Sequence, residues 1–308
     1  MKLRAILSLS LFIGFLTIAS LWTAQQAPSW FPPQASAESK LIDGLFSTLT
    51  GIGTFILLGI TLILLYAVLF QRAEKYDSSD GPAIEGNVPL EIAWTAIPLF
   101  LVLWIAFHSY EIYETMGIRG PMEIVHLHHP MEMQAAYAAP VEQPVRETID
   151  VTAKQWAWVF QYPEQKVTST ELHLPIDRRI RLTMHSDDVI HGFFVPAFRI
   201  KQDVIPNKTI EFEFTPIRTG TYRLRDSMYS GTYFAANQAD IVVESLQDYE
   251  KWLADAASRT PSAAYNQAAD EYDRAGEKAL VRGWKSIPPA APPVVNFAPK
   301  QEPTSPPA

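Results

Sequence analysis

The stretch GTYRLRDSMYSGTYFAANQADIVV, residues 220–243, decides the fold of the second half of this chain. Its two ends, TYRLR and ADIVV, are short runs in which β-branched and aromatic residues favour strands. The segment between them holds Gly, Ser and Asn, which favour turns and loops. The stretch therefore predicts the last two strands of a small β-domain, joined by a loop.

Upstream of this stretch the same β-rich pattern continues back to residue 147. Further short runs, separated by segments with Pro, Asp, Asn or Gly, are ETIDVTA, QWAWVFQY, STELHL, RIRLTMHS, VIHGFFV and KTIEFEF. Strands this short and closely spaced, with no helical segment between them, predict an antiparallel sandwich or barrel. We therefore expect residues 147–245 to form one all-β domain.

Three apolar runs lie in the first third of the chain, at residues 5–22, 44–70 and 89–110. The first, within residues 1–24, is either the core of a signal peptide or a first transmembrane helix, because its length fits both. The second and third are each long enough to cross a bilayer of roughly 30 Å. We expect residues 44–113 to form a transmembrane hairpin.

Basic residues set the orientation of these helices. Lys2 and Arg4 precede the first run and Arg72 and Lys75 follow the second, whereas the intervening loop offers only Lys40. Cytoplasmic loops carry the excess of Lys and Arg, so the chain after the third run should lie in the periplasm or an equivalent lumen. The sequence predicts an integral protein of a plasma or thylakoid-type membrane, with its β-domain exported.

The segments around the β-domain have distinct compositions. The linker at residues 114–146 holds histidines and methionines, which suit copper, although a flexible connector is the preferred interpretation. The candidate copper-capture residues are His126, His128, His129, Met131 and Met133. Residues 246–286 have helical spacing and mixed charge, and the proline-rich residues 287–308 predict a disordered tail.

Charge and cysteine content exclude several classes of function. The net charge is −8, which argues against a nucleic-acid partner. The chain has no cysteine, so disulfides, thiolate metal ligands, thiol catalysis and a lipid-modified cysteine are all excluded.

Four motifs in this order carry a specific resemblance. They are NVPLEIAWTAIP, KQWAWVFQYP, SDDVIHGFFVPAFRIKQDVIPNKT and the stretch at residues 220–243, and together they resemble subunit 2 of the haem-copper terminal oxidases. The resemblance implies a membrane hairpin packed on subunit 1, with subunit 3 as a further partner, and an exported Greek-key domain of the cupredoxin type. In that family a dinuclear copper centre in this domain accepts electrons from cytochrome c, and the haem and further copper lie in subunit 1.

The copper ligands of the family are missing from this sequence. The pattern is a histidine in the DVIH segment followed by C-x-E-x-C-x-x-x-H-x-x-M, and only His191 matches it. The other positions hold Asp226, Met228, Ser230, Phe234 and Asn237. Neither a carboxylate nor a hydroxyl replaces a bridging thiolate, so we expect no cofactor on this subunit and a hydrogen-bonded His191. A substitute mononuclear site from His191, Asp226 and Met228 is the less favoured alternative.

Subunits 2 without copper are typical of the quinol-oxidising branch, and this chain most resembles the cyanobacterial-type alternative respiratory terminal oxidase. Trp156 matches the tryptophan through which the cytochrome c branch admits electrons, and we interpret it as an aromatic core residue here. We expect a subunit with no catalytic residues of its own in a quinol oxidase. The alternatives are a cytochrome c oxidase subunit 2 with altered electron entry and a membrane-anchored copper-handling or assembly protein.

Overall fold

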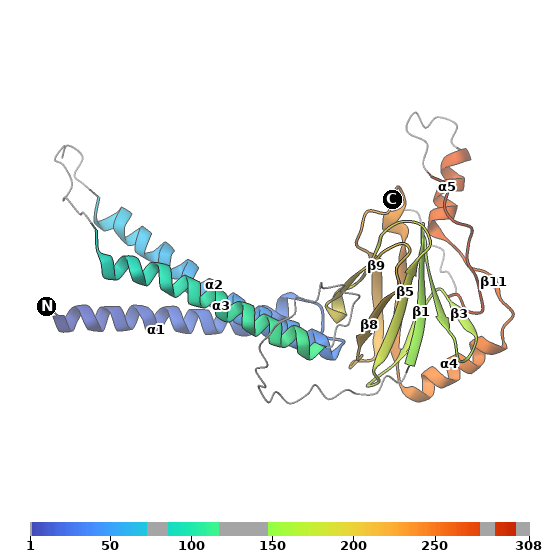
Figure 1. Ribbon diagram of the computed structural model, residues 1–308, viewed down its shortest axis with the longest axis horizontal. Coiled ribbons are helices and arrows are strands. Elements are labelled where there is room, and N and C mark those ends of the chain that lie inside the picture. Colours follow the sequence, from blue (N-terminus) through green and yellow to red (C-terminus); the bar gives the residue numbers. More distant parts are fainter. Residues whose placement is uncertain (1, 73–85, 117–146, 278–286, 300–308) are drawn as a thin grey trace, which may run out of the picture. The chain divides into compact units, whose positions relative to one another are not determined.

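The structure is a computed structural model that describes residues 2–72, 86–116, 147–277 and 287–299 (Figure 1). The chain divides into two compact units. One unit contains Met1–Phe31 and Leu41–Thr115, and the other contains Pro32–Lys40 and Met116–Ala308. The linker candidates His126, His128, His129, Met131 and Met133 lie outside the described residues, so copper capture by the linker stays a prediction.

The first unit is built from three long apolar helices, each long and apolar enough to cross a membrane. They are α1 (Lys2–Gln26), followed by the 3-10 turn η1 (Ala27–Trp30), α2 (Ala37–Phe70) and α3 (Val88–Met116). Small residues on α2 allow α1 to approach closely: an added Cβ at Gly51 would lie 3.2 Å from Ala24. Ser47 Oγ also donates a hydrogen bond to the carbonyl of Ala24 at 2.6 Å.

Two of these helices begin at polar capping residues, which lie outside the apolar runs of the sequence. At α3, Leu90 donates its backbone N–H to Asn87 Oδ1 at 3.2 Å, and Asn87 donates its own to Glu91 Oε1 at 3.2 Å, a reciprocal cap. At α2, Ser36 Oγ accepts from the backbone N–H of Ser39 at 3.0 Å, so the helix starts at Ala37 and not at residue 44, where the apolar run begins.

The second unit is a sandwich of two five-stranded sheets. The first sheet has the order β3 (Val167–Ser169), β2 (Ala157–Tyr162), β1 (Glu147–Lys154), β5 (Ile180–Ser186) and β8 (Ile210–Phe214). The second has the order β4 (Leu172–Pro175), β10 (Gln238–Glu244), β9 (Gly220–Asp226), β6 (His191–Val195) and β7 (Ile200–Val204), with the 3-10 turn η2 (Pro196–Phe198) before β7 and η3 (Phe234–Ala236) before β10.

The sandwich is confirmed, but two details differ from the expectation. Both sheets are mixed, because β1 pairs with β5 in parallel and β4 pairs with β10 in parallel. The chain between β1 and β5 crosses to the other sheet at β4, and such a crossover returns a strand parallel to the first. β7 is an edge strand whose sequence, IKQDV, lacks the apolar density of the other runs and was not predicted.

Alternating side chains form the core between the sheets. In β5, Ile180, Leu182 and Met184 are fully buried while the residues between them face outward, as the period of two requires. Burying each such side chain stabilises the fold by roughly 1.5–3 kcal/mol. This packing makes the sandwich a rigid frame for the loops at its ends.

The segment before α2 is part of the β-domain. Ala35 donates its backbone N–H to the carbonyl of Ala197 at 3.0 Å and accepts from Ile217 at 2.9 Å. Glu38, which is nearly buried, accepts a hydrogen bond from Arg179 at 2.6 Å. Residues 32–40 are therefore fixed to the sandwich by backbone pairing and a buried ion pair.

The C-terminal extension begins with α4 (Leu246–Ser258) and α5 (Gln267–Glu277), which lie at opposite ends of the sandwich (Figure 1). The expected disordered tail is wrong for residues 287–299. β12 (Val294–Val295) pairs with β11 (Ser262–Ala263), and Asn296 Oδ1 accepts the backbone N–H of Thr168 in β3 at 3.0 Å. Val295 is buried, so a few apolar residues order this proline-rich segment although its average composition suggests disorder.

Candidate functional site

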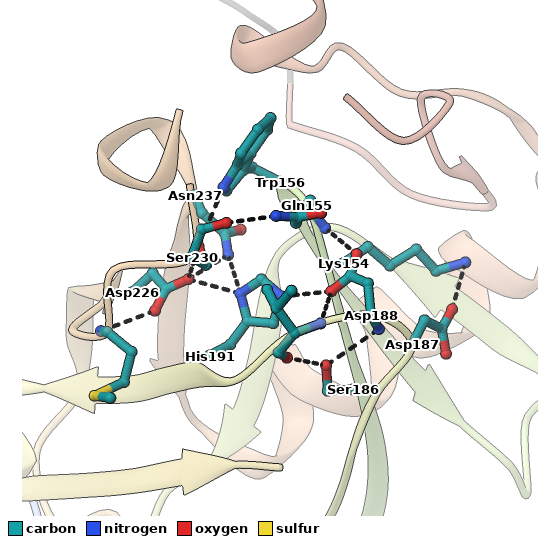
Figure 2. Close-up of polar contacts among 12 residues, drawn as sticks. Lys154, Gln155, Trp156, Ser186, Asp187, Asp188, His191, Asp226, Ser230 and Asn237 are labelled. Carbon is teal, nitrogen blue, oxygen red and sulfur yellow. Dashed lines mark hydrogen bonds and ion pairs between the residues drawn. The ribbon is translucent and has the colours of Figure 1, made fainter. Parts of the chain in front are cut away.

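Four of the six positions that match the copper ligands of the resembled family bring their side chains together, at one end of the second sheet. His191 is the first residue of β6 and Asp226 the last of β9, and these strands pair with Phe193 opposite Asp226. Asn237 stands directly before β10, the other neighbour of β9. Figure 2 shows the side chains of His191, Asp226, Ser230 and Asn237 pointing toward one another.

Asp226 is the centre of a closed hydrogen-bond network. Its Oδ2 accepts from His191 Nδ1 at 2.7 Å, from Ser230 Oγ at 3.0 Å and from Asn237 Nδ2 at 3.0 Å. Its Oδ1 accepts from the backbone N–H groups of Gly192 at 2.7 Å and Met228 at 3.1 Å. The side chain has no exposed surface, so a carboxylate buried at the sheet end is stabilised by five donors.

His191 uses both ring nitrogens in this network. Its Nδ1 pairs with Asp226, and its Nε2 lies 2.9 Å from Asp188 Oδ1 on the loop before β6. The ring is fully buried and packs against the edge of Trp158, with the ring centroids 6.0 Å apart. Two carboxylates on one imidazole favour the protonated ring, in which both nitrogens donate.

The pKa values of both groups follow from these contacts. Burial lowers the pKa of His191, but the hydrogen bonds to Asp226 and Asp188 outweigh burial and raise the pKa above its usual value. Burial raises the pKa of Asp226, but the hydrogen bonds from His191, Gly192, Asn237 and Met228 outweigh it, and the pKa is lowered. Both shifts favour the ion pair of imidazolium and carboxylate over the neutral forms of the two groups.

The remaining two positions contribute less to the network. Met228 supplies its backbone N–H to Asp226, and no contact of its sulfur is seen among the described residues. Phe234 begins η3, is half-buried and packs edge to face on the exposed ring of Tyr229 at 5.3 Å. The substitute site of His191, Asp226 and Met228 thus has a nitrogen and a carboxylate that already bind each other.

A dinuclear copper centre does not fit these donors. Copper of this kind requires soft, anionic sulfur, whereas the side chains at the site offer a carboxylate, a hydroxyl, an amide and an imidazole whose two nitrogens face carboxylates. Within the described residues, no group of three or more His, Cys, Asp or Glu side chains is placed to hold a metal ion. The chemistry available at this site is hydrogen bonding.

Trp156 is connected to the same network, and its backbone carbonyl is bound by the C-terminal extension. Its Nε1 donates to Ser230 Oγ at 3.1 Å, and its ring packs edge to face on Tyr233. Asn266 of the extension donates from Nδ2 to the carbonyl of Trp156 at 3.1 Å, and Tyr233 packs against Tyr272 of α5. Trp156 is only 2% exposed, so its ring is buried beside the network, and its role as an aromatic core residue stays a prediction.

Three residues of this site were not predicted as part of it. Asp188 and its neighbour Asp187 are acidic loop residues, yet Asp188 turns inward to His191 and to the backbone N–H of Gln155, while Asp187 pairs with Lys154. Asp188 stands three residues before His191, and this short spacing could have indicated from the sequence that the two side chains interact. Gln155 and Asn266 reach the site through contacts far apart in the chain, for which no local signal exists.

The fold and the site together define a membrane-anchored β-sandwich domain with a histidine retained at the end of its sheet. The profile for the transmembrane domain of cytochrome c oxidase subunit II matches residues 20–112, and that for its periplasmic domain matches residues 166–246. The chain therefore belongs to the family of cytochrome c oxidase subunit 2, as its relatives also show.

Two similar relatives carry the name "Cytochrome c oxidase subunit 2". The protein of Synechocystis sp. is 35% identical over 80% of this chain and 81% of its own length, and that of Thermostichus vulcanus is 31% identical over 77% and 81%. The "Quinol oxidase subunit 2" of Bacillus subtilis is 25% identical over 78% of this chain and 68% of its own.

Family membership fixes the location and the assembly of the chain. It is a membrane protein whose C-terminal domain lies outside, and subunit 2 of a haem-copper terminal oxidase complex, which fits a partnership with subunit 1.

Proposed function

We propose that this chain is the copper-free subunit 2 of a terminal oxidase that takes its electrons from a membrane quinol. The observation that carries this proposal is the hydrogen-bond network in which Asp226 and Ser230 occupy the positions of the two bridging thiolates. A domain without a metal at this site has no group to receive a single electron from cytochrome c. Electrons must then enter the complex elsewhere, and a quinol in the membrane can deliver them directly to subunit 1.

The burial of Trp156 supports the same conclusion. In the cytochrome c branch this tryptophan is the point of electron entry, so it must face the docked cytochrome. Here Asn266 binds its carbonyl, and Ala290 donates its backbone N–H to the neighbouring carbonyl of Gln155 at 2.6 Å. The C-terminal extension is thus bound to the backbone beside this tryptophan, whose ring is only 2% exposed.

The subunit itself then has a structural role. Its helices anchor the β-domain, and its partners are subunit 1, which holds the haem and copper, and subunit 3. It contributes no catalytic side chain. This role is supported by the same network, since both ring nitrogens of His191 and both oxygens of Asp226 already bind protein groups.

A second candidate function is a cytochrome c oxidase with altered electron entry. The names of the two relatives above 30% identity favour it. Overall identity does not decide between the two functions, because electron entry depends on a few ligand positions and not on the rest of the sandwich.

The test is oxygen consumption by the purified oxidase that contains this chain. We expect robust consumption with a reduced quinol and none above background with reduced cytochrome c. The matched control is a cytochrome c oxidase with its copper ligands intact, which should show the reverse preference. Rapid oxidation of cytochrome c by the complex of this chain would contradict the proposal and support altered electron entry.

A further inference from the structure

A shallow groove with a volume of about 440 Å³ lies on the β-domain beside β9. Three arginines, Arg218, Arg223 and Arg225, contribute to its lining, together with the ring of Tyr222 and the prolines of the segment before α2 and of η2. We call it the arginine groove. It lies apart from the His191 network, since none of the residues of that network lines it.

Contacts within the domain hold the walls of this groove in place. Arg199 bridges two of them, donating from Nη1 to the carbonyl of Pro196 and from Nη2 to the carbonyl of Pro32, both at 2.8 Å. Tyr222 donates its hydroxyl to the carbonyl of Arg218 at 2.8 Å, and its ring packs on Phe198 at 5.2 Å. The groove is thus formed before any ligand binds, which lowers the entropic cost of binding.

The groove carries uncompensated positive charge. Arg223 pairs with Asp240 at 3.0 Å, but in the described part of the chain no carboxylate forms an ion pair with Arg218 or Arg225. The alternation of β9 places Arg223 and Arg225 on the same outward face, both exposed. Guanidinium groups present planar, paired N–H donors that match the oxygens of a phosphate.

One wall of the groove follows the first apolar helix closely in the sequence. Pro32, one of its walls, directly follows Phe31 in sequence, and consecutive Cα atoms are about 3.8 Å apart. Phe31 packs edge to face on Phe46 at 4.7 Å, as Trp30 does at 6.2 Å, and Phe46 lies in the apolar run of α2. Tryptophan gathers at the level of the lipid headgroups, so we expect Trp30 to lie near the membrane surface.

We propose that the arginine groove binds a phosphate group, and that a phospholipid of the outer leaflet supplies it. The free guanidinium groups provide the charge, and Tyr222 and the prolines provide an apolar wall for the adjoining glycerol. Binding there ties the base of the exported domain to the bilayer surface. This inference is independent of the electron donor of the complex.

The experiment measures lipid binding by the full-length chain in mild detergent, with native mass spectrometry during a titration with phosphatidylglycerol. The groove variant is Arg218→Gln with Arg225→Gln. The matched control, Lys166→Gln with Lys208→Gln, removes the same charge from exposed positions of the domain outside the groove. We expect the groove variant to bind the tightest-binding lipid at least about tenfold more weakly than wild type, because it loses two charged donors to the phosphate. The control should bind the lipid within about twofold of wild type.

Competition with inorganic phosphate identifies the source of the phosphate group. Retention of the lipid in excess phosphate supports a lipid site, and displacement supports a phosphate site for a soluble ligand. Equal lipid affinity in wild type and both variants would overturn the proposal, provided that near-ultraviolet circular dichroism shows all three folded. Loss of subunit 1 from the oxidase of the groove variant, with unchanged lipid affinity, would also overturn it and assign the groove to an acidic protein surface.

Discussion

Two histidines of the β-domain each lie between two carboxylates, at different places in the fold. Only one of them occupies a position of the family's copper ligands. His191 lies between Asp226 and Asp188, and His173 lies between Glu244 at 2.8 Å and Glu171 at 3.1 Å. The hydrogen bonds to the two carboxylates raise the pKa of each histidine, against the opposite effect of burial.

The role of His173 is structural. Its ring stacks on Trp252 of α4 with the centroids 3.8 Å apart, and on its edge lies Phe297 of the ordered C-terminal segment. A histidine between two carboxylates thus joins the extension to β4 and β10, with no relation to a metal. By this comparison we propose that the arrangement around His191 also serves the stability of the fold.

Restoring the family's copper ligands around His191 should have the largest effect, because it would make His191 a metal ligand and leave His173 in its hydrogen bonds. The variant with Asp226→Cys, Met228→Glu, Ser230→Cys, Phe234→His and Asn237→Met keeps the spacing of the family and the position of His191. We expect it to bind copper with a free energy on the order of 10 kcal/mol, the scale of structural metal sites with thiolate ligands. The measurement is the visible absorption and paramagnetic signal of a mixed-valence, thiolate-bridged copper pair.

The control for this reconstruction carries Asp226→Ser and leaves Ser230 unchanged, with the other three substitutions. It should show none of the signal, because it lacks both thiolates. A reconstructed chain that folds but gives only mononuclear copper would mean that the loops around η3 have diverged from the family.

Removal of the central carboxylate should have the next largest effect. Asp226→Ala leaves His191 Nδ1 and the donors of Ser230 and Asn237 without their acceptor, and should destabilise the domain by about 3–5 kcal/mol. The control, Asp240→Ala, breaks the partly exposed pair with Arg223 and should cost about 0.2–1 kcal/mol. Thermal unfolding of the full-length chain in mild detergent measures both, and equal shifts would refute the role of Asp226.

A smaller, pH-dependent effect should appear at the other histidine. Because the folded-state pKa of His173 is raised, its contribution is complete below the unfolded value of about 6.5 and is lost as the pH rises through the folded pKa. His173→Gln should therefore lower stability by about 1–3 kcal/mol below about pH 6.5, and less in alkaline solution.

The check on this pH dependence is the melting temperature of wild type and variant measured across that range. The control is His185→Gln, since the one contact seen for the ring of His185 is Thr209 at 3.4 Å and no carboxylate faces it among the described residues. A stability difference for His173→Gln that does not change with pH would show that the imidazolium is not the stabilising form.

Much of the fold could be predicted from local patterns. The apolar runs predicted the helices, and the β-rich runs predicted the sandwich, because hydrophobic period and strand propensity are properties of neighbouring residues. β7 was missed because an edge strand with polar residues lacks that signal. Val295 and Phe297 order the tail through contacts with β3 and α4, which its composition does not encode.

The site was predictable only in part. The absence of thiolates could be read directly from the sequence, and the unchanged spacing placed His191 and Asp226 together. Asp188 contacts His191, and Asn266 binds the carbonyl of Trp156, which lies 110 residues away in the sequence. Both contacts join loops that only the fold brings together. Hydrogen-bond partners of this kind are set by tertiary structure, so residue type alone could not identify them.

The central claim is that the His191 site is closed by hydrogen bonds and takes up no redox copper. The most direct test is the copper content and paramagnetic spectrum of the full-length wild-type chain, purified without other subunits, incubated with copper and desalted, beside His191→Gln. We predict no retained copper that depends on His191 and no thiolate-type absorption. Copper retained in proportion to the chain and lost in His191→Gln would contradict the account.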